Sequence, residues 1–244
     1  MEAPDRMRPL GAGATLGWAL LVFAIAQGVG AAVVLFWFSS MAPSSLAKIR
    51  YDGALVALVT LITNPLQIVL LAAVVRWRTG GGATEYLGLT RFSRQNFLIG
   101  FLAVAGLVAV LDGLSYLAGL DIVSPFQTES FTTARADGWM WPLLLAIVVV
   151  GPAGEEVMFR GFLFRGWVAP GAQGVIAIVV IALVWAGMHV QYDWFGIGQV
   201  FLTGLVLGWL RWRSGSTLLT ILLHVLVNLE GSLETLVTMN WSVP

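Results

Sequence analysis

The sequence contains no cysteine, which excludes disulfides and cysteine-based metal sites and leaves the redox compartment undetermined. Charged residues are also scarce: they make up 11% of the 244 residues, against about 25% in soluble domains. The formal net charge is zero, so the composition does not point to nucleic acid binding. What the chain has instead is hydrophobicity, because 58% of its residues are apolar. A mean hydropathy of +0.87 is typical of a polytopic membrane protein.

Seven apolar segments approach the length of about 20 residues that a membrane span needs. They lie at 13–38, 54–76, 97–120, 139–166, 173–191, 194–211 and 216–238. The first is much longer than the apolar core of a signal peptide, so we expect it to be a retained helix. The sequence therefore predicts an all-α, polytopic transmembrane helical bundle of about seven spans, with an eighth, partial or interfacial helix as the alternative. We expect residues 1–244 to form a single integral membrane domain.

The distribution of positive charge predicts the orientation of the bundle. The hydrophilic stretch 76–96 holds four arginines, and Arg6 and Arg8 precede the first span. Positive residues gather in cytoplasmic loops, so we expect the N-terminus in the cytoplasm and the C-terminus outside. Lys48 and Arg50 are the one contrary signal. The composition favours a multi-pass protein of a bacterial plasma membrane.

Two adjacent glutamates, Glu155 and Glu156, interrupt the fourth apolar segment. A carboxylate in hydrocarbon is unfavourable, and ionisable residues there usually serve a function. Arg160 lies four residues after Glu156, so the two share a helix face, while Glu155 points about 100° away from Glu156. We expect Glu156 to pair with Arg160 and hold the helix in place, and Glu155 to face a cavity.

The only two histidines of the chain also lie in apolar segments. Trp185 and His189 share one helix face, and His224 and Asn228 share another, because both pairs are four residues apart. Each pair alone is also compatible with a structural role, as an interfacial histidine or as hydrogen bonds between helices.

Together the polar groups form a hydrolytic set. Glu155 and His189 could position and deprotonate a water, and His224 and Asn228 could donate to the oxyanion that forms on an attacked carbonyl. Serine and cysteine nucleophiles are disfavoured, because there is no cysteine and no Gly-x-Ser-x-Gly elbow.

The ordered set Glu-Glu-x-x-x-Arg, aromatic-x-x-x-His and His-x-x-x-Asn, each on an apolar segment, resembles the CPBP intramembrane proteases. This family includes type II CAAX prenyl endopeptidases and bacteriocin-processing and immunity proteins. The resemblance covers about residues 139–230. Its second motif usually opens with Phe, whereas this chain has Trp185.

The resemblance implies an endopeptidase that hydrolyses peptide bonds of membrane-associated substrates, with or without a CAAX-like lipid group. It assigns water activation to Glu155 and His189, and oxyanion stabilisation to His224 and Asn228. A peptide or membrane-protein substrate and the lipid bilayer are the expected partners. A non-catalytic membrane regulator or immunity protein of the same fold is the alternative.

Members of the family are often called metalloproteases. If zinc takes part, Glu155, His189 and His224 would be its ligands, with one position open. The chain lacks the His-Glu-x-x-His motif, and a metal-free mechanism driven by a glutamate needs the same residues. We therefore expect no metal.

These roles require Glu155 and His189 to lie at similar depths. A fourth helix that ended at Arg160 would leave them about 20 Å apart along the membrane normal. We therefore expect a long, kinked fourth helix that continues to about Trp167.

Overall fold

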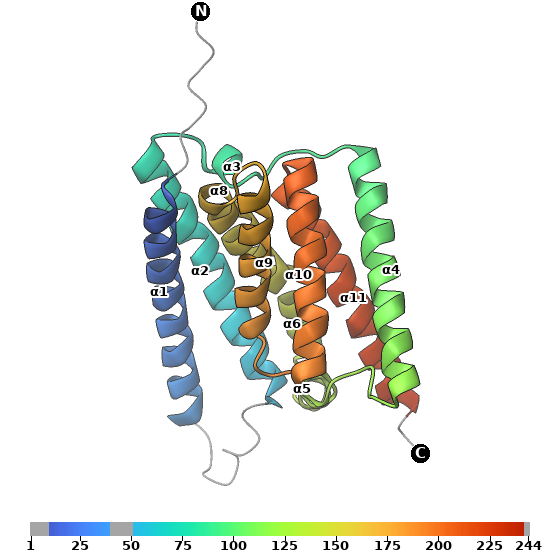
Figure 1. Ribbon diagram of the computed structural model, residues 1–244. Coiled ribbons are helices and arrows are strands. Elements are labelled where there is room, and N and C mark those ends of the chain that lie inside the picture. The colour runs from blue at the N-terminus through green and yellow to red at the C-terminus, as the bar shows by residue number, and fades with distance from the viewer. Residues whose placement is uncertain (1–9, 40–50, 242–244) are drawn as a thin grey trace, which may run out of the picture.

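The computed structural model describes residues 10–39 and 51–241, and within these ranges it contains helices and no strands. The helices that match predicted spans are α1 (Ala12–Ser39), α2 (Gly53–Thr79), α4 (Arg94–Ala118), α9 (Ala172–Gly187), α10 (Trp194–Ser214) and α11 (Thr217–Trp241), together with the composite helix described below. The all-α transmembrane bundle is thus confirmed (Figure 1).

In the described part of the chain, six helices are long and apolar enough to cross a membrane. The segment predicted at 173–191 forms α9, which has only 16 residues and is therefore shorter than a full span. Its apolar pattern ends where Met188 caps the helix and a turn follows through Tyr192. Lys48 and Arg50 lie outside the described residues.

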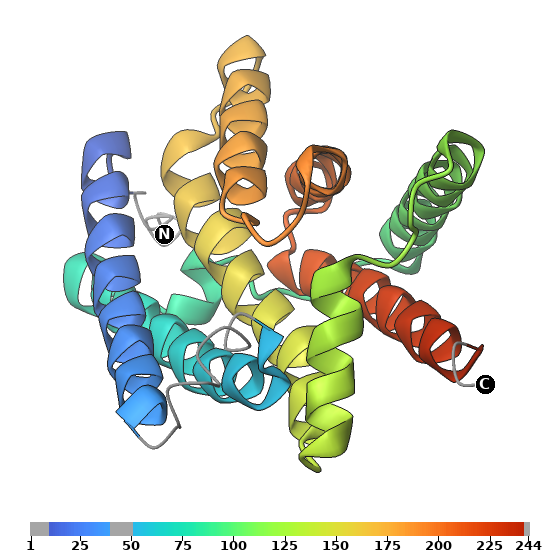
Figure 2. The same ribbon diagram turned by 90° about the horizontal axis from the view of Figure 1, so that it is seen from below.

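The fourth predicted span is one continuous helix over Met140–Trp167, as expected. It consists of α6 (Met140–Leu144), a π-helical segment η2 (Leu145–Val150), α7 (Gly151–Glu156), a second π-helical segment η3 (Val157–Leu163) and α8 (Phe164–Trp167). It is the most buried span: 56% of its most apolar window is buried, compared with 17–33% for the others. Figure 2 shows it running through the middle of the bundle, between α1 and α2 on one side and α10 and α11 on the other.

Two short helices lie outside the spans. The hydrophilic stretch after α2 contains α3 (Ala83–Tyr86), and α5 (Pro125–Ala136) follows α4. Ser124 caps α5 through a reciprocal capping box with Gln127, and Pro125 opens its first turn. We did not predict α5, because its polar sequence carries no membrane-span signal.

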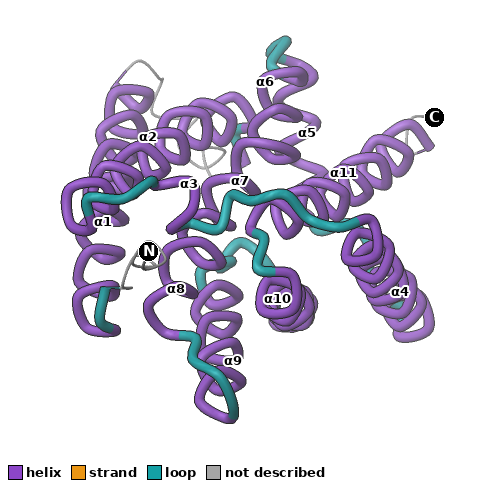
Figure 3. The backbone as a smooth tube through the Cα atoms, turned by 90° about the horizontal axis from the view of Figure 1, so that it is seen from above, coloured by secondary structure: helices purple, strands orange, loops and turns teal. Residues whose placement is uncertain are grey.

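The two ends of the bundle differ in what covers them. One end carries α3, α8 and the loop from α10 to α11, whereas α5 lies across the opposite end (Figures 1 and 2). Viewed from the α3 end, α4 stands at the edge of the bundle, beside α10 and α11 (Figure 3). The largest hydrophobic core joins the composite helix to α1, α2, α10 and α11.

Candidate active site

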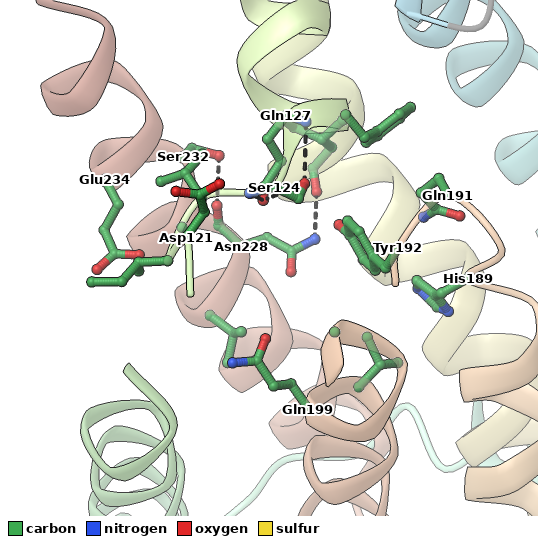
Figure 4. A pocket seen from close by; sticks show the side chains of 18 of the residues that line it. Asp121, Ser124, Gln127, His189, Gln191, Tyr192, Gln199, Asn228, Ser232 and Glu234 are labelled. Atoms are coloured by element: carbon green, nitrogen blue, oxygen red, sulfur yellow. Dashed lines mark hydrogen bonds between the residues drawn. The ribbon is translucent and has the colours of Figure 1, made fainter. Parts of the chain in front are cut away.

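The first π-helical segment leaves a carbonyl group that a side chain must satisfy. In η2 the Gly151 N–H bonds to the Ala146 carbonyl, five residues back. The same pattern would pair the Ile147 carbonyl with Pro152, which has no N–H. The Asn228 amide nitrogen on α11 donates to this carbonyl instead, at 2.7 Å (Figure 4). A predicted site residue thus anchors the composite helix to α11.

The second π-helical segment repeats this arrangement. In η3 the Phe164 N–H bonds to the Phe159 carbonyl, again five residues back. The next carbonyl, that of Arg160, accepts a hydrogen bond from Arg211 Nε at 2.9 Å, and the Thr217 hydroxyl lies 3.4 Å from it. Side chains of α10 and α11 therefore fix both ends of α7, the segment that carries Glu155 and Glu156.

Glu156 lies at the centre of a buried ionic network. Its Oε1 accepts from Arg160 Nη1 at 2.8 Å and lies 3.1 Å from His224 Nδ1. Both Glu156 and Arg160 are fully buried, and Arg160 Nη2 also donates to the Gly204 carbonyl. The close approach of α10 needs a glycine there, since a Cβ on Gly204 would lie 3.0 Å from Trp185. The predicted pair between Glu156 and Arg160 is present, and it joins α7, η3, α10 and α11.

Trp185 connects this network to the neighbouring glutamate, Glu155. The Arg160 guanidinium lies 4.3 Å from the centre of the Trp185 ring, a cation–π distance. Both histidine rings meet the indole edge to face, at 5.2 Å for His189 and 5.3 Å for His224. On its other side, the indole Nε1 donates to Glu155 Oε2 at 2.6 Å.

The hydrogen bond from Trp185 to Glu155 explains what tryptophan adds at a position where the family pattern usually has Phe. Phe at this position would fill similar space but has no N–H to donate. In this chain the aromatic residue therefore both packs between the histidines and holds one carboxylate oxygen of Glu155. Glu155 itself is only partly buried, unlike Glu156.

The hydrogen bond of His189 fixes its neutral tautomer. His189 Nδ1 lies 2.8 Å from the Trp185 carbonyl, and a carbonyl can only accept, so Nδ1 carries the proton. The Nε2 atom of the neutral ring then has a free lone pair and can accept a proton or orient a water.

His224 and Asn228 are held by structural bonds on one side each. His224 Nδ1 faces the Glu156 carboxylate, which also accepts only, so Nε2 is the atom that remains for other chemistry. Asn228 uses one N–H for the Ile147 carbonyl and retains its second N–H and its oxygen. His224 and Asn228 therefore each hold a structural hydrogen bond with one group and keep another group for the proposed chemistry.

All four predicted catalytic residues line one cavity of about 700 Å³: Glu155, His189, His224 and Asn228. Asp112, Gln199 and Glu234 are among the other polar side chains in its walls. Figure 4 shows Asn228 approaching this space from α11 and His189 from the turn that follows α9. Glu155 and His189 are not separated by a span half-length, because the Trp185 side chain contacts both.

Tyr192 is a cavity residue that the sequence analysis missed. It follows α9 in the loop to α10 and stacks on His189, with 6.0 Å between ring centres and 17° between their planes. Burial raises the pKa of Tyr192 to about 12, and the negative charge of Glu155 adds to the rise. The phenol therefore remains a hydrogen-bond donor at physiological pH. The loop position, three residues after His189, was the only signal for it.

The proposed zinc ligands do not converge as one set in this structure. Among the described residues, one group of three acidic or histidine side chains has its ligand atoms within 4.8 Å of one another. It consists of Asp112, Glu230 and Glu234. Glu155, His189 and His224 do not form such a group. As placed, these three side chains do not form the zinc site that the resemblance suggested, and no step below uses a metal.

Comparisons with known proteins agree with the motif pattern. Residues 137–229 match the family model described as type II CAAX prenyl endopeptidase Rce1-like. A curated protein of Escherichia coli, named only as an uncharacterized 24.3 kDa protein, is 28% identical over 131 residues. That match spans 53% of this chain and 58% of the relative. No solved structure matches.

The matched range overlaps the segment 139–230 on which the resemblance was based, and all of the proposed site residues lie inside it. Glu155 and Asn228 are the first and last of them along the chain. The polar set described above therefore lies in the segment of this chain that is similar to the Rce1-like type II CAAX prenyl endopeptidases.

Proposed function

We propose that this protein is an intramembrane endopeptidase that uses Glu155 to activate water for peptide-bond hydrolysis. The observation that carries the proposal is the environment of Glu155. Its carboxylate is held by Trp185 at the wall of a cavity that His189 also lines. A cavity of about 700 Å³ lies within the range of about 300–1,000 Å³ typical of ligand sites.

The reaction begins with a water between Glu155 and His189. The His189 Nε2 lone pair orients the water, and the Glu155 oxygen that Trp185 does not hold accepts its proton as the water oxygen attacks the peptide carbonyl carbon. The carbonyl oxygen becomes an oxyanion. Glu155 then passes the proton to the peptide nitrogen, the C–N bond breaks as the oxyanion re-forms the C=O bond, and a carboxylic acid and an amine leave; the acid then gives its proton to the amine.

The oxyanion needs hydrogen-bond donors on the opposite wall of the cavity. The second N–H of Asn228 is one. His224 can donate through Nε2 when its ring is protonated, and the Glu156 carboxylate at Nδ1 compensates that charge. Tyr192 is a third donor, from the loop side of the cavity.

The test is cleavage of fluorogenic peptides, lipidated and plain, by purified protein and by Glu155→Gln. Glutamine keeps the shape and still accepts from Trp185, but it cannot take the water proton. General-base catalysis contributes about 10²–10⁴-fold, so we expect a loss of that size with unchanged folding. Each protein is measured with and without a strong chelator.

Equal cleavage by both proteins would refute the role of Glu155. Loss of wild-type cleavage on chelation, restored by added metal, would refute the metal-free mechanism. Absence of cleavage by the wild type over the whole panel, with cellular activity retained by Glu155→Gln, would instead support the regulator alternative.

A further inference from the structure

The two ends of the bundle carry opposite charge. The end with α3 and α8 carries arginines and a single acidic residue among the described residues: Arg76, Arg78, Arg91, Arg94, Arg165, Arg211, Arg213 and Glu85. The end crossed by α5 carries carboxylates and one cation, again among the described residues: Asp52, Asp112, Asp121, Glu129, Asp137, Asp193, Glu230, Glu234 and Arg135.

Such an asymmetry orients a membrane protein. Lys and Arg flanking the spans are retained in the cytoplasm, so the arginine-rich end faces the cytoplasm and the α5 end faces away from it. Arg135 of α5 counts against this orientation, as do Lys48 and Arg50, which lie outside the described residues. Seven arginines at one end outweigh them.

The cavity extends toward the end with the carboxylates. Its lining includes the loop from Gly119 to Ser124, residues of α5, the loop at Tyr192 and the C-terminal half of α11 as far as Glu234. Among the residues that the structure describes, no lysine or arginine lines it. Phe126 of α5 contacts Tyr192 edge to face, so α5 and the loop after α9 together frame this side of the cavity.

Between the cavity and the arginine-rich end of the bundle, packed side chains fill the space. Beyond Glu155 lie the buried pair of Glu156 and Arg160, and beyond them Arg211, whose Nε bonds to the Arg160 carbonyl and the Thr217 hydroxyl. Buried aromatic and aliphatic residues of the main core fill the space around this column: Tyr86, Leu87, Phe162, Leu207, Leu210, Leu219 and Leu223. This packing leaves the α5 end as the way into the cavity.

We propose that the substrates are peptide segments on the non-cytoplasmic side of the membrane, such as the juxtamembrane part of an exported or membrane-anchored protein. This inference rests on the proposed endopeptidase activity and names its substrate class. A chain end that stays in the cytoplasm would have to cross the packed arginine-rich half of the bundle to reach Glu155.

The side of the opening can be measured without any catalytic assay, because the chain has no cysteine. Asp121→Cys places one thiol at the cavity mouth, and Glu85→Cys places one at the arginine-rich end; both positions are exposed. Intact and permeabilised cells are treated with a membrane-impermeant maleimide. We expect equal labelling of Asp121→Cys in both, and labelling of Glu85→Cys only after permeabilisation. The reverse pattern would overturn the proposal.

Two single-span reporters then test the substrate class. Both carry the same cleavable juxtamembrane segment, on the non-cytoplasmic side in one and on the cytoplasmic side in the other. We expect cleavage of the first alone, lost in Glu155→Gln. Cleavage of the second alone would overturn the proposal. Cleavage of both reporters by Glu155→Gln as by wild type would refute the proposed function, while the labelling result would still report the side of the opening.

Discussion

The two adjacent glutamates occupy opposite kinds of environment, although one peptide bond joins them. Glu156 is fully buried and bonded to Arg160 and His224, whereas Glu155 is partly buried and faces a cavity. The difference follows from helix geometry, since successive residues point about 100° apart. The composite helix thus turns one carboxylate into the packed half of the bundle and the other into the open half.

This comparison separates two tasks within one short motif. The Glu156 side fixes the positions of four helical segments, and the Glu155 side carries out the proposed chemistry. Trp185 lies on the boundary, because it stacks on Arg160 and donates to Glu155. Variants on the Glu156 side should therefore lose stability, whereas variants on the Glu155 side should lose activity.

The largest loss of stability is expected from Arg160→Met. Methionine is an uncharged side chain of roughly similar length, so the change removes the buried cation and leaves the Glu156 carboxylate without its main partner. Breaking a buried ion pair on one side typically lowers the free energy of unfolding by about 3–5 kcal/mol. Thermal unfolding of the protein in detergent measures this. Arg94→Met, at the exposed start of α4, is the control and should unfold like the wild type. Equal unfolding of the two variants would contradict a structural role for the pair.

A smaller structural effect is expected from Asn228→Leu. The Ile147 carbonyl would lose its donor, and an unsatisfied buried carbonyl costs about 1–3 kcal/mol. The same unfolding measurement applies.

The matched test is Pro152→Ala in the Asn228→Leu background. Alanine supplies the N–H that Pro152 lacks, so it should recover part of the lost stability. No recovery, or no loss in Asn228→Leu itself, would show that the carbonyl is satisfied in another way.

The sequence predicted much of this arrangement for a simple reason. Apolar segments of span length and four-residue spacings depend only on helix geometry, so the spans and the Glu156–Arg160 pair could be read directly. The long fourth helix followed from the need to bring Glu155 and His189 to one depth.

Other features depend on contacts between distant segments and carried no local signal. The π-helical segments are recognisable only when Asn228 and Arg211 are seen to satisfy the freed carbonyls. Helix α5 is polar and short, so its place across the cavity end was not predictable. Tyr192 resembled any loop tyrosine until its stacking on His189 was known.

Trp185→Phe tests the residue that lies between the structural Glu156 side and the proposed catalytic Glu155 side. The phenyl ring keeps an aromatic face between the histidines, but the hydrogen bond to Glu155 is lost. Hydrogen bonds to charged groups contribute about 1.5–3 kcal/mol, and water in the cavity can replace part of this. We expect kcat to fall about tenfold, equivalent to about 1.4 kcal/mol, with KM nearly unchanged.

Trp194→Phe is the matched control, because Trp194 is 88% exposed and lies outside the cavity lining. It should leave kcat and KM unchanged. A rise in KM with constant kcat in Trp185→Phe would show that Trp185 shapes the substrate site rather than positioning Glu155.

The smallest effect is expected from Tyr192→Phe. Removal of a full oxyanion donor lowers kcat by about 10²–10³-fold in well-studied hydrolases, but Tyr192 is carried by a loop and shares the role with Asn228 and His224. We therefore expect a fall of about tenfold or less in kcat. Tyr116→Phe, on the exposed face of α4, should have no effect.

The pH dependence of this variant separates a hydrogen-bond donor from a packing residue. The pKa of Tyr192 is raised to about 12, so the neutral phenol persists well above its ordinary range near 10. The ratio of wild-type to Tyr192→Phe rates should therefore stay constant from pH 7 to about pH 10, and the donor should be lost only near pH 12. A ratio that falls to about half of its pH 7 value by about pH 10 would mean that the phenol ionises in its ordinary range, and hence that burial and Glu155 do not raise its pKa.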